Sequence, residues 1–265
     1  MDKVRTHTVN AAGHSCRVLE SGTGSPVVFF AGIGGLPRWT PFLDALASTH
    51  RVIAPSLPGF PGSADFRHLD EYYEWIVAAL ELLEAIGEDS VDLVASSVAG
   101  PLAAEVAGIA RSRIRRLVLI APFGIYDAAD PTADIWAQRP GPDVLPTLLC
   151  SNADQWKRQW EMPAVEDPVE WGLHLTRSME AAARFLFPMG NTGIEKRLYR
   201  VRQPTLLVRG ADDRVMPASY QSRFAARLGG PVVSQTIANA GHLVELDQAT
   251  ELARQINAFF VDQQY

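Results

Sequence analysis

Short apolar runs alternate with amphipathic helical patterns along most of the chain, and this alternation limits the fold more than any other feature. Six runs bounded by turn residues are expected to be buried strands: residues 26–31, 51–54, 91–95, 115–121, 204–208 and 232–237. Other segments place apolar residues on one helical face, namely Leu69, Tyr72, Ile76, Leu80 and Leu83, and later Leu252, Ile256, Phe259 and Phe260. The pattern predicts an α/β fold whose mostly parallel sheet is covered by helices on both faces.

The alternation stops in the middle of the chain. Residues 123–198 contain no clear strand pattern, many prolines, four of the six tryptophans and a helix-compatible segment at 170–187. We therefore predict a helical cap domain at 123–198, inserted into a core domain formed by residues 1–122 and 199–265.

Composition excludes several classes of protein. The formal net charge of -6 provides no basic stripe for a phosphate backbone, so nucleic acid is not an expected partner. The two cysteines, Cys16 and Cys150, lack the spacing of a metal site or a disulfide framework, and both are expected to be reduced thiols. No leader-like or membrane-length apolar run is present, so the sequence predicts a cytoplasmic protein and permits a homo-oligomer.

Residues 93–100, LVASSVAG, place two serines where an apolar run changes to small residues. A serine nucleophile at a strand-to-helix turn needs small residues two positions before and two positions after it, because the turn brings the backbone close. Centring the turn on Ser97 puts Ala95 and Ala99 there, whereas centring it on Ser96 puts two β-branched valines there. Ser97 is therefore the candidate nucleophile, although a serine in this position is also a good helix N-cap.

Two further loops carry the groups that could activate such a serine. Asp212 and Asp213 follow the run at 204–208, and His242 follows the run at 232–237. The carboxyl ends of parallel strands meet at one edge of a sheet, so these loops are expected to converge with Ser97. The chain order of serine, aspartate and histidine is the order of the α/β-hydrolase triad.

The chain resembles the α/β-hydrolase superfamily over nearly its full length. Five segments carry the resemblance: FFAGIGG, RVIAPSLPGFPGS, LVASSVAG, PTLLVRGADDRVMP and NAGHLVELDQ. Members usually read His-Gly in the first, Asp-Leu-Pro-Gly in the second and G-x-S-x-G in the third, where this chain has Ala31-Gly32, Ser56 before Leu-Pro-Gly, and alanines around Ser97. The resemblance implies a mostly parallel eight-stranded sheet flanked by helices, with a helical cap inserted after strand 6.

Carried over to this sequence, the resemblance implies a role for each motif residue. Ser97 would be the nucleophile, His242 the general base and then acid, and Asp213 the carboxylate that orients the histidine. The backbone N–H groups of Ile33 and Val98 would form the oxyanion hole. No metal or organic cofactor is implied.

Other interpretations of these motifs remain open at this point. Asp212 competes with Asp213 for the acid position of the triad. Asp127, which follows the expected strand at 115–121, is a further alternative because some family members carry the acid after that strand. The glycines that follow Ala31 could suggest a dinucleotide loop, but G-x-G-x-x-G would require a glycine where the chain has Pro37.

The leading functional hypothesis is a serine hydrolase that cleaves a carboxylic ester or lactone of an apolar small molecule through an acyl-enzyme. One alternative is the family's C–C hydrolases of ring-cleavage products, which usually carry asparagine and tryptophan where this chain has Ser96 and Leu243. Another is a ligand-binding or cyclase-like member without hydrolytic turnover. Candidate residues of the substrate pocket are Ser96, Trp136, Trp160, Phe185, Phe187 and Leu243.

Overall fold

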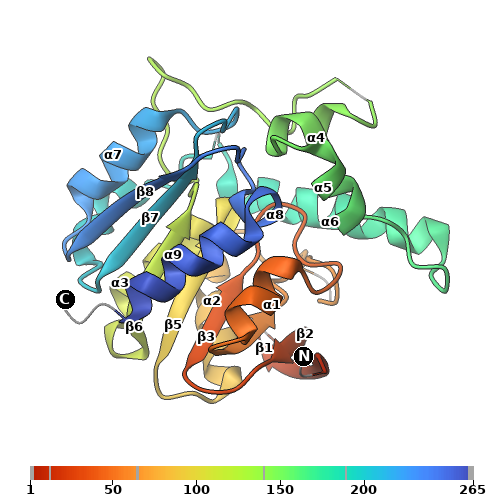
Figure 1. The fold of residues 1–265 in the computed structure, drawn as a ribbon, viewed down its shortest axis with the longest axis horizontal. Coiled ribbons are helices and arrows are strands. Elements are labelled where there is room, and N and C mark those ends of the chain that lie inside the picture. Colours follow the sequence, from red (N-terminus) through yellow and green to blue (C-terminus); the bar gives the residue numbers. More distant parts are fainter. Residues whose placement is uncertain (1–2, 12, 64–65, 140, 189, 262–265) are drawn as a thin grey trace.

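An eight-stranded sheet forms the centre of the protein, with strand order β1-β2-β4-β3-β5-β6-β7-β8 (Figure 1). The computed structural model describes residues 3–11, 13–63, 66–139, 141–188 and 190–261. The strands are β1 (Arg5–Ala11), β2 (His14–Ser21), β3 (Pro26–Phe30), β4 (Arg51–Pro55), β5 (Val91–Ser96), β6 (Ile114–Ile120), β7 (Thr205–Gly210) and β8 (Val232–Ile237). β2 runs antiparallel to β1 and β4, and the pairs from β4 to β8 are parallel.

Helices cover both faces of this sheet. They are α1 (Pro41–Ala47), α2 (Tyr72–Ile86), α3 (Gly100–Ile109), α4 (Val144–Leu149), α5 (Ala153–Gln159), α6 (Pro168–Leu186), α7 (Ala218–Arg227), α8 (Val244–Asp247) and α9 (Ala249–Val261). Four short 3₁₀ turns complete the set: η1 (Ser97–Ala99), η2 (Arg111–Arg113), η3 (Ile194–Lys196) and η4 (Leu198–Arg200). In Figure 1, α1 and α9 lie in front of the sheet, and α2 and α3 lie behind it.

The alternation of side chains along each strand divides the core into two layers. On β5, Leu93 and Ala95 belong to the cluster packed by α2 and α3, whereas Val94 belongs to the cluster packed by α1 and α9. Successive residues of a strand point to opposite faces, so a strand covered on both faces must be apolar throughout. This explains why β5 is buried at every position.

The hairpin of β1 and β2 is the part of the sheet that the apolar runs did not indicate. Most residues of β1 are exposed, and its sequence RTHTVNA is largely polar. β1 is an edge strand, and it is held by antiparallel pairing with β2 from Arg5↔Glu20 to Ala11↔His14. Its stability therefore depends on main-chain hydrogen bonds with its neighbour and not on burial of its own side chains.

The chain between β6 and β7 contributes helices α4, α5 and α6. Within the described residues of this segment, the only sheet-type pairing is one isolated bridge between Gly124 and Asn191. The C-terminal part of α6 packs on the body, where Phe185 meets Trp75 of α2 with ring centroids 4.9 Å apart. The N-terminal end of α6 extends beyond the body of the molecule, below α4 and α5 (Figure 1). Of the helices described, none is long and apolar enough to cross a membrane.

Candidate active site

Ser97 lies in a strained turn at the carboxyl end of β5. The strand ends at Ser96, η1 begins at Ser97 and α3 follows from Gly100. Ser97 has a φ of 52°, in the left-handed region that residues other than glycine rarely adopt, and its side chain is buried. Such strain typically costs about 1–3 kcal/mol and persists only where the surrounding structure imposes it.

Close packing on both sides imposes this turn. A Cβ atom added to Gly32, in the loop after β3, would lie 2.9 Å from Ser97 Cβ and 3.0 Å from Ser96 Oγ. A Cβ atom on Gly100 would lie 2.6 Å from Pro122 Cβ. Ala95 and Ala99, the residues that replace the usual glycines, are fully buried in this packing. The turn therefore accommodates alanine at 95 and 99, while Gly32 and Gly100 provide the closest approaches.

Ser97, His242 and Asp213 form one continuous chain of hydrogen-bonding groups. Ser97 Oγ lies 2.7 Å from His242 Nε2, and His242 Nδ1 lies 3.1 Å from Asp213 Oδ2. The side chains of His242 and Asp213 are fully inaccessible to solvent, and Ser97 is equally buried. A histidine placed in this way can accept the serine proton on Nε2 while the carboxylate accepts the hydrogen bond from Nδ1–H.

Asp213 is held as an ionised group. Burial acts to raise the pKa of its carboxyl, but the proximity and hydrogen bond of His242 and two backbone N–H groups act in the opposite direction, and the pKa lies below its ordinary value. Those backbone donors are Val215 N at 2.8 Å and Met216 N at 2.9 Å from Asp213 Oδ1. One carboxylate oxygen is thus fixed by the backbone, which leaves the other for the histidine.

The competing residues lie elsewhere. Asp212 accepts a hydrogen bond from Ser151 Oγ at 3.2 Å, and Asp127 pairs with Arg223 at 2.8 Å. Ser96 Oγ has no hydrogen-bond partner among the described residues. Of the candidates left open by the sequence, Ser97 and Asp213 are therefore the ones that the fold places against His242.

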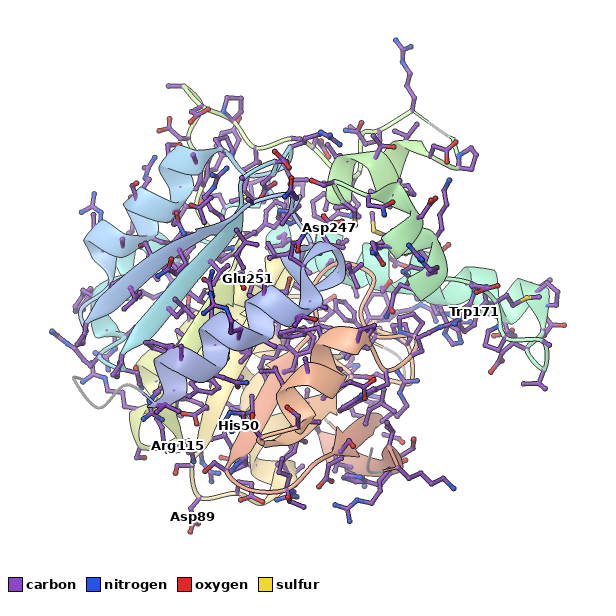
Figure 2. The ribbon with its side chains drawn as sticks, viewed as in Figure 1. His50, Asp89, Arg115, Trp171, Asp247 and Glu251 are labelled. Carbon is purple, nitrogen blue, oxygen red and sulfur yellow. The ribbon has the colours of Figure 1, made fainter. Side chains whose placement is uncertain are left out.

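The loop that carries His242 is tied to the helices between β6 and β7. Asp247 accepts hydrogen bonds from the backbone N–H groups of Gly241 at 2.8 Å, Ser151 at 2.7 Å and Asn152 at 3.1 Å. Asp247 is labelled in Figure 2, where α8 lies close to α4 and α5. A single carboxylate thus joins the start of α5 to the residue that precedes the histidine.

The loop after β3 brings the predicted oxyanion residues to the same place. Gly32 packs directly on Ser97, and the next residue, Ile33, is buried, as is Val98 in the first turn after the serine. The amide of Phe123 donates to the carbonyl of Ser97 at 3.2 Å, which fixes the turn from the side of β6. Val98 is thus the neighbour of Ser97 in the chain, and Ile33 follows the glycine that packs on Ser97. Their part in an oxyanion hole stays a prediction.

A cavity of about 240 Å³ lies between the segment after β6 and the C-terminal end of α6. Its lining is mainly apolar and includes Phe123, Trp136, Leu186 and Phe187. The ring of Phe123 also meets the ring of His242 edge-on, with centroids 5.5 Å apart. Phe123 was not among the predicted pocket residues, although its place just after β6, at the carboxyl edge of the sheet, was a usable indication.

The predicted pocket residues divide into two groups. Trp136 and Phe187 line the large cavity, and Leu243 lines a cavity of about 20 Å³ beside Gly32 and Ile33. The other three have different surroundings: Phe185 is buried against Trp75, Trp160 packs between Trp156 and Trp171, and Ser96 lies under Gly32. Phe185 serves the core because the C-terminal half of α6 turns this ring toward α2.

Within the described part of the chain, no group of three histidine, cysteine, aspartate or glutamate side chains is arranged to hold a metal ion. The geometry of the site thus consists of the serine, the histidine and the aspartate, the two loops that carry backbone amides, and the adjoining cavity.

Comparisons with known proteins agree with this arrangement. The model of the alpha/beta hydrolase family matches residues 27–255. The chain is 26% identical over 268 residues to 2-hydroxy-6-oxo-2,4-heptadienoate hydrolase of Pseudomonas putida strain F1, covering 95% of this chain and 94% of that protein.

Two solved structures show the same fold at lower identity. The meta-cleavage product hydrolase of Pseudomonas fluorescens IP01 has a TM-score of 0.77 at 19% identity, covering 96% of this chain and 97% of that one. A carboxylesterase of Bacillus subtilis has a TM-score of 0.71 at 17% identity, covering 98% and 92%. The chain therefore belongs to the alpha/beta hydrolase family and is a hydrolase.

Proposed function

We infer that this hydrolase cleaves a carbon–carbon bond beside a ketone in a dienoate of the ring-cleavage type, with Ser97 as nucleophile. The buried chain of Ser97, His242 and Asp213 is the observation that carries the serine mechanism. The bond is inferred from a relative that matches over 95% of this chain, whose name gives a 6-oxo-dienoate as its substrate. Hydrolysis at a ketone breaks a carbon–carbon bond, because a ketone has no ester oxygen to leave.

The reaction follows from the positions of the three side chains. His242 Nε2 accepts the proton of Ser97 while Oγ adds to the ketone carbon, and the carbonyl oxygen becomes an oxyanion. The step uses the 2-oxo tautomer of the substrate, in which the enol proton has moved to the carbon beside the ketone. When the carbon–carbon bond breaks, its electron pair passes through the remaining double bond to the 2-oxo oxygen, which takes up a proton from His242. Water, deprotonated by His242, then hydrolyses the acyl-enzyme and restores Ser97.

The backbone N–H groups of Ile33 and Val98 are proposed to stabilise the oxyanion. A donor of this kind is typically worth about 3–4 kcal/mol in the transition state, and a backbone donor does not depend on the side chain present. Replacement of the usual histidine by Ala31 is compatible with this role, because the packing of Gly32 on Ser97 positions the loop.

We expect Gly32→Ala to damage this site. The new Cβ would lie 2.9 Å from Ser97 Cβ, so the loop must move away from the serine, and such overpacking typically costs about 1–3 kcal/mol of unfolding free energy. Turnover should fall with it, because Ile33 N–H moves from its place. The measurement is kcat together with the free energy of unfolding in urea.

Gly172→Ala is the matched control. A Cβ atom there meets nothing within 4 Å, and Gly172 lies inside α6, so alanine should leave kcat unchanged and stabilise the helix slightly. Equal effects of the two substitutions on kcat would contradict the proposed contact between the loop and Ser97.

The cavity beside Phe123 is proposed to hold the apolar end of the substrate, and residues 123–198 are proposed to act as the cap that closes it. Trp136 and Phe187 line the cavity, and the indole N–H of Trp136 donates to the carbonyl of Met179 on α6 at 3.0 Å. The shape of this pocket thus depends on how α6 sits over the sheet edge. The cytoplasmic location and the state of assembly stay predictions.

The bond specificity can be tested directly. We expect kcat/KM for 2-hydroxy-6-oxo-2,4-heptadienoate or its 6-phenyl analogue to exceed that for p-nitrophenyl acetate and butyrate by at least about 100-fold, a difference of about 2.7 kcal/mol in transition-state binding. Loss of dienoate absorbance and release of p-nitrophenolate are the two measurements. Faster turnover of the esters would contradict the assignment.

Ester or lactone hydrolysis is the second candidate, and two residues favour it. The sequence favoured this reading because Ser96 and Leu243 stand where the C–C hydrolases usually carry asparagine and tryptophan. Leu243 is buried and lines only the small cavity near Ile33. Ester turnover above dienoate turnover would establish this candidate, and a wild-type protein that a fluorophosphonate fails to label would instead favour a ligand-binding member without turnover.

A further inference from the structure

Glu245 carries a buried carboxyl group beside the site, and the proposed reaction does not use it. It lies three residues after His242, at the start of α8, and is 6% exposed. Together with Gly32 and Ile33 it lines the cavity of about 20 Å³ behind the loop that follows β3. Its Oε2 atom has no hydrogen-bond partner among the residues that the structure describes.

Ser96 presents a matching group to the same loop. Its hydroxyl is fully buried and is likewise without a partner in the described part of the chain. Ser96 Oγ would lie 3.0 Å from a Cβ atom on Gly32, so the hydroxyl sits directly under the residue before Ile33. Ser96 is also near enough to Glu245 to lower the pKa of its carboxyl as a hydrogen-bonding neighbour. Buried polar atoms nearly always have a partner, and each of these groups is the partner available to the other.

We propose that Glu245 is a positioning residue for the oxyanion site: its carboxyl and the Ser96 hydroxyl form a pair that supports the loop of Gly32 and Ile33 from behind. The inference rests on the proposed function, because the position of Ile33 N–H matters only if an oxyanion forms there. It gives a role to the carboxyl group in a cavity whose other lining residues, apart from Thr40 and Gln159, are apolar or glycine.

The pair supports the oxyanion site without a charge of its own only while the carboxyl is protonated. Burial raises the pKa of Glu245, Asp247 raises it further, and Ser96 and His242 act in the opposite direction without cancelling the rise. Cys150, at the end of α4, also faces Glu245 and is itself a thiol whose pKa is raised by burial. A protonated carboxyl can donate to Ser96 Oγ without adding a charge. A carboxylate can only accept from the Ser96 hydroxyl, and it would place a negative charge beside the developing oxyanion.

The direction of the pH effect follows from this pKa. A raised pKa keeps Glu245 neutral through the ordinary range of a carboxyl, and a negative charge appears beside the oxyanion site as pH rises through the raised value. We therefore expect the rate of the wild-type enzyme to decline on the alkaline side as Glu245 ionises.

The test compares Glu245→Gln with the wild-type protein across neutral and alkaline pH. The probes are diisopropyl fluorophosphate, whose rate of reaction with Ser97 is followed by intact mass, and p-nitrophenyl acetate, for kcat. Glutamine keeps a donor at every pH, so the variant should retain the neutral rate within about threefold and lose the alkaline decline. Glu245→Leu removes the donor and should lower both rates about tenfold at neutral pH.

Two further variants separate positioning from general damage. Ser96→Ala removes the acceptor, and combining it with Glu245→Leu should cost no more than either change alone, since both act through one contact. Glu251→Gln changes an exposed carboxylate on α9, labelled in Figure 2, and should leave the pH profile unchanged.

The outcomes decide the proposal. An alkaline decline that persists unchanged in Glu245→Gln overturns it, and so does a folded Glu245→Leu protein with wild-type rates. If Glu245→Leu does not fold, the isosteric glutamine variant still gives the answer. Failure of the proposed function has a different result. If only the bond assignment fails, esters are turned over faster than the dienoate and the comparison of Glu245→Gln with wild type still applies; if the serine mechanism fails, diisopropyl fluorophosphate does not react with Ser97 in the wild-type protein, and this role for Glu245 is refuted with it.

Discussion

Ser97→Ala should reduce turnover by about 10⁴- to 10⁶-fold while the protein remains folded. The substitution removes only Oγ, the atom that lies 2.7 Å from His242 Nε2, and leaves the packing of Gly32 against the β-carbon unchanged. The measurements are steady-state kcat with the best substrate and the addition of one phosphonyl group from a fluorophosphonate, followed by intact mass. The wild-type protein should be labelled once, and the variant should not be labelled.

Ser96→Ala is the matched control for this result. Ser96 is the neighbouring buried serine, but it does not reach His242, so its loss should cost no more than about tenfold. Comparable losses in the two variants, or labelling of Ser97→Ala at the wild-type rate, would contradict the assignment of Ser97.

The strain at Ser97 adds a stability readout to the same experiment. Glycine tolerates a φ of 52° that costs other residues about 1–2 kcal/mol. We therefore expect Ser97→Gly to be inactive and yet more stable than Ser97→Ala by about 1 kcal/mol in urea unfolding. An alanine variant as stable as the glycine variant would show that this turn stores no strain.

Asp213→Asn should reduce kcat by about 10⁴-fold. The carboxylate accepts from Val215 N and Met216 N with one oxygen and from His242 Nδ1–H with the other. The asparagine amide has only one oxygen and its NH₂ group donates, so it cannot accept hydrogen bonds on both sides. Histidine is then held in the wrong tautomer and is no longer stabilised when it becomes protonated.

Asp212→Asn provides the control at the adjacent position. Asp212 contacts Ser151 and not the histidine, so its amide variant should keep kcat within about threefold of wild type. A larger effect at Asp212 than at Asp213 would reverse the assignment of the acid, and the pH profile of kcat in the Asp213 variant would then match that of the wild-type protein.

Much of the fold followed from the sequence because buried parallel strands leave a strong pattern. The six apolar runs correspond to β3 through β8, the Leu69–Leu83 face corresponds to α2, and the segment at 170–187 corresponds to α6. The exposed strand β1 left no such pattern, since its partner and not its side chains stabilises it. The eight-stranded sheet was therefore expected from the family resemblance alone.

In the site as well, some residues could be predicted from their local sequence, whereas others depend on tertiary packing. Ser97, Asp213 and His242 each lie in the loop or turn that follows a strand, so their convergence depends on strand order, which the α/β pattern determines. Phe123 also lies just after a strand, β6, but its contact with the cavity could not be assigned from that position alone, and neither could the burial of Glu245. Their surroundings are created by α6 and by the packing of α8 behind the loop of Ile33, and no local pattern records those contacts.

The three backbone hydrogen bonds accepted by Asp247 have a consequence for how such a protein can diversify. They fasten the beginning of α5 to the histidine loop, so a change of length or direction at residues 151 and 152 would displace His242 as well. Among the described residues, no hydrogen bond joins the C-terminal end of α6 to the histidine loop, and this end borders the cavity of about 240 Å³. New substrate preferences are therefore expected to arise by substitutions along α6 and the segment after β6, while the junction of α4 and α5 remains fixed in length.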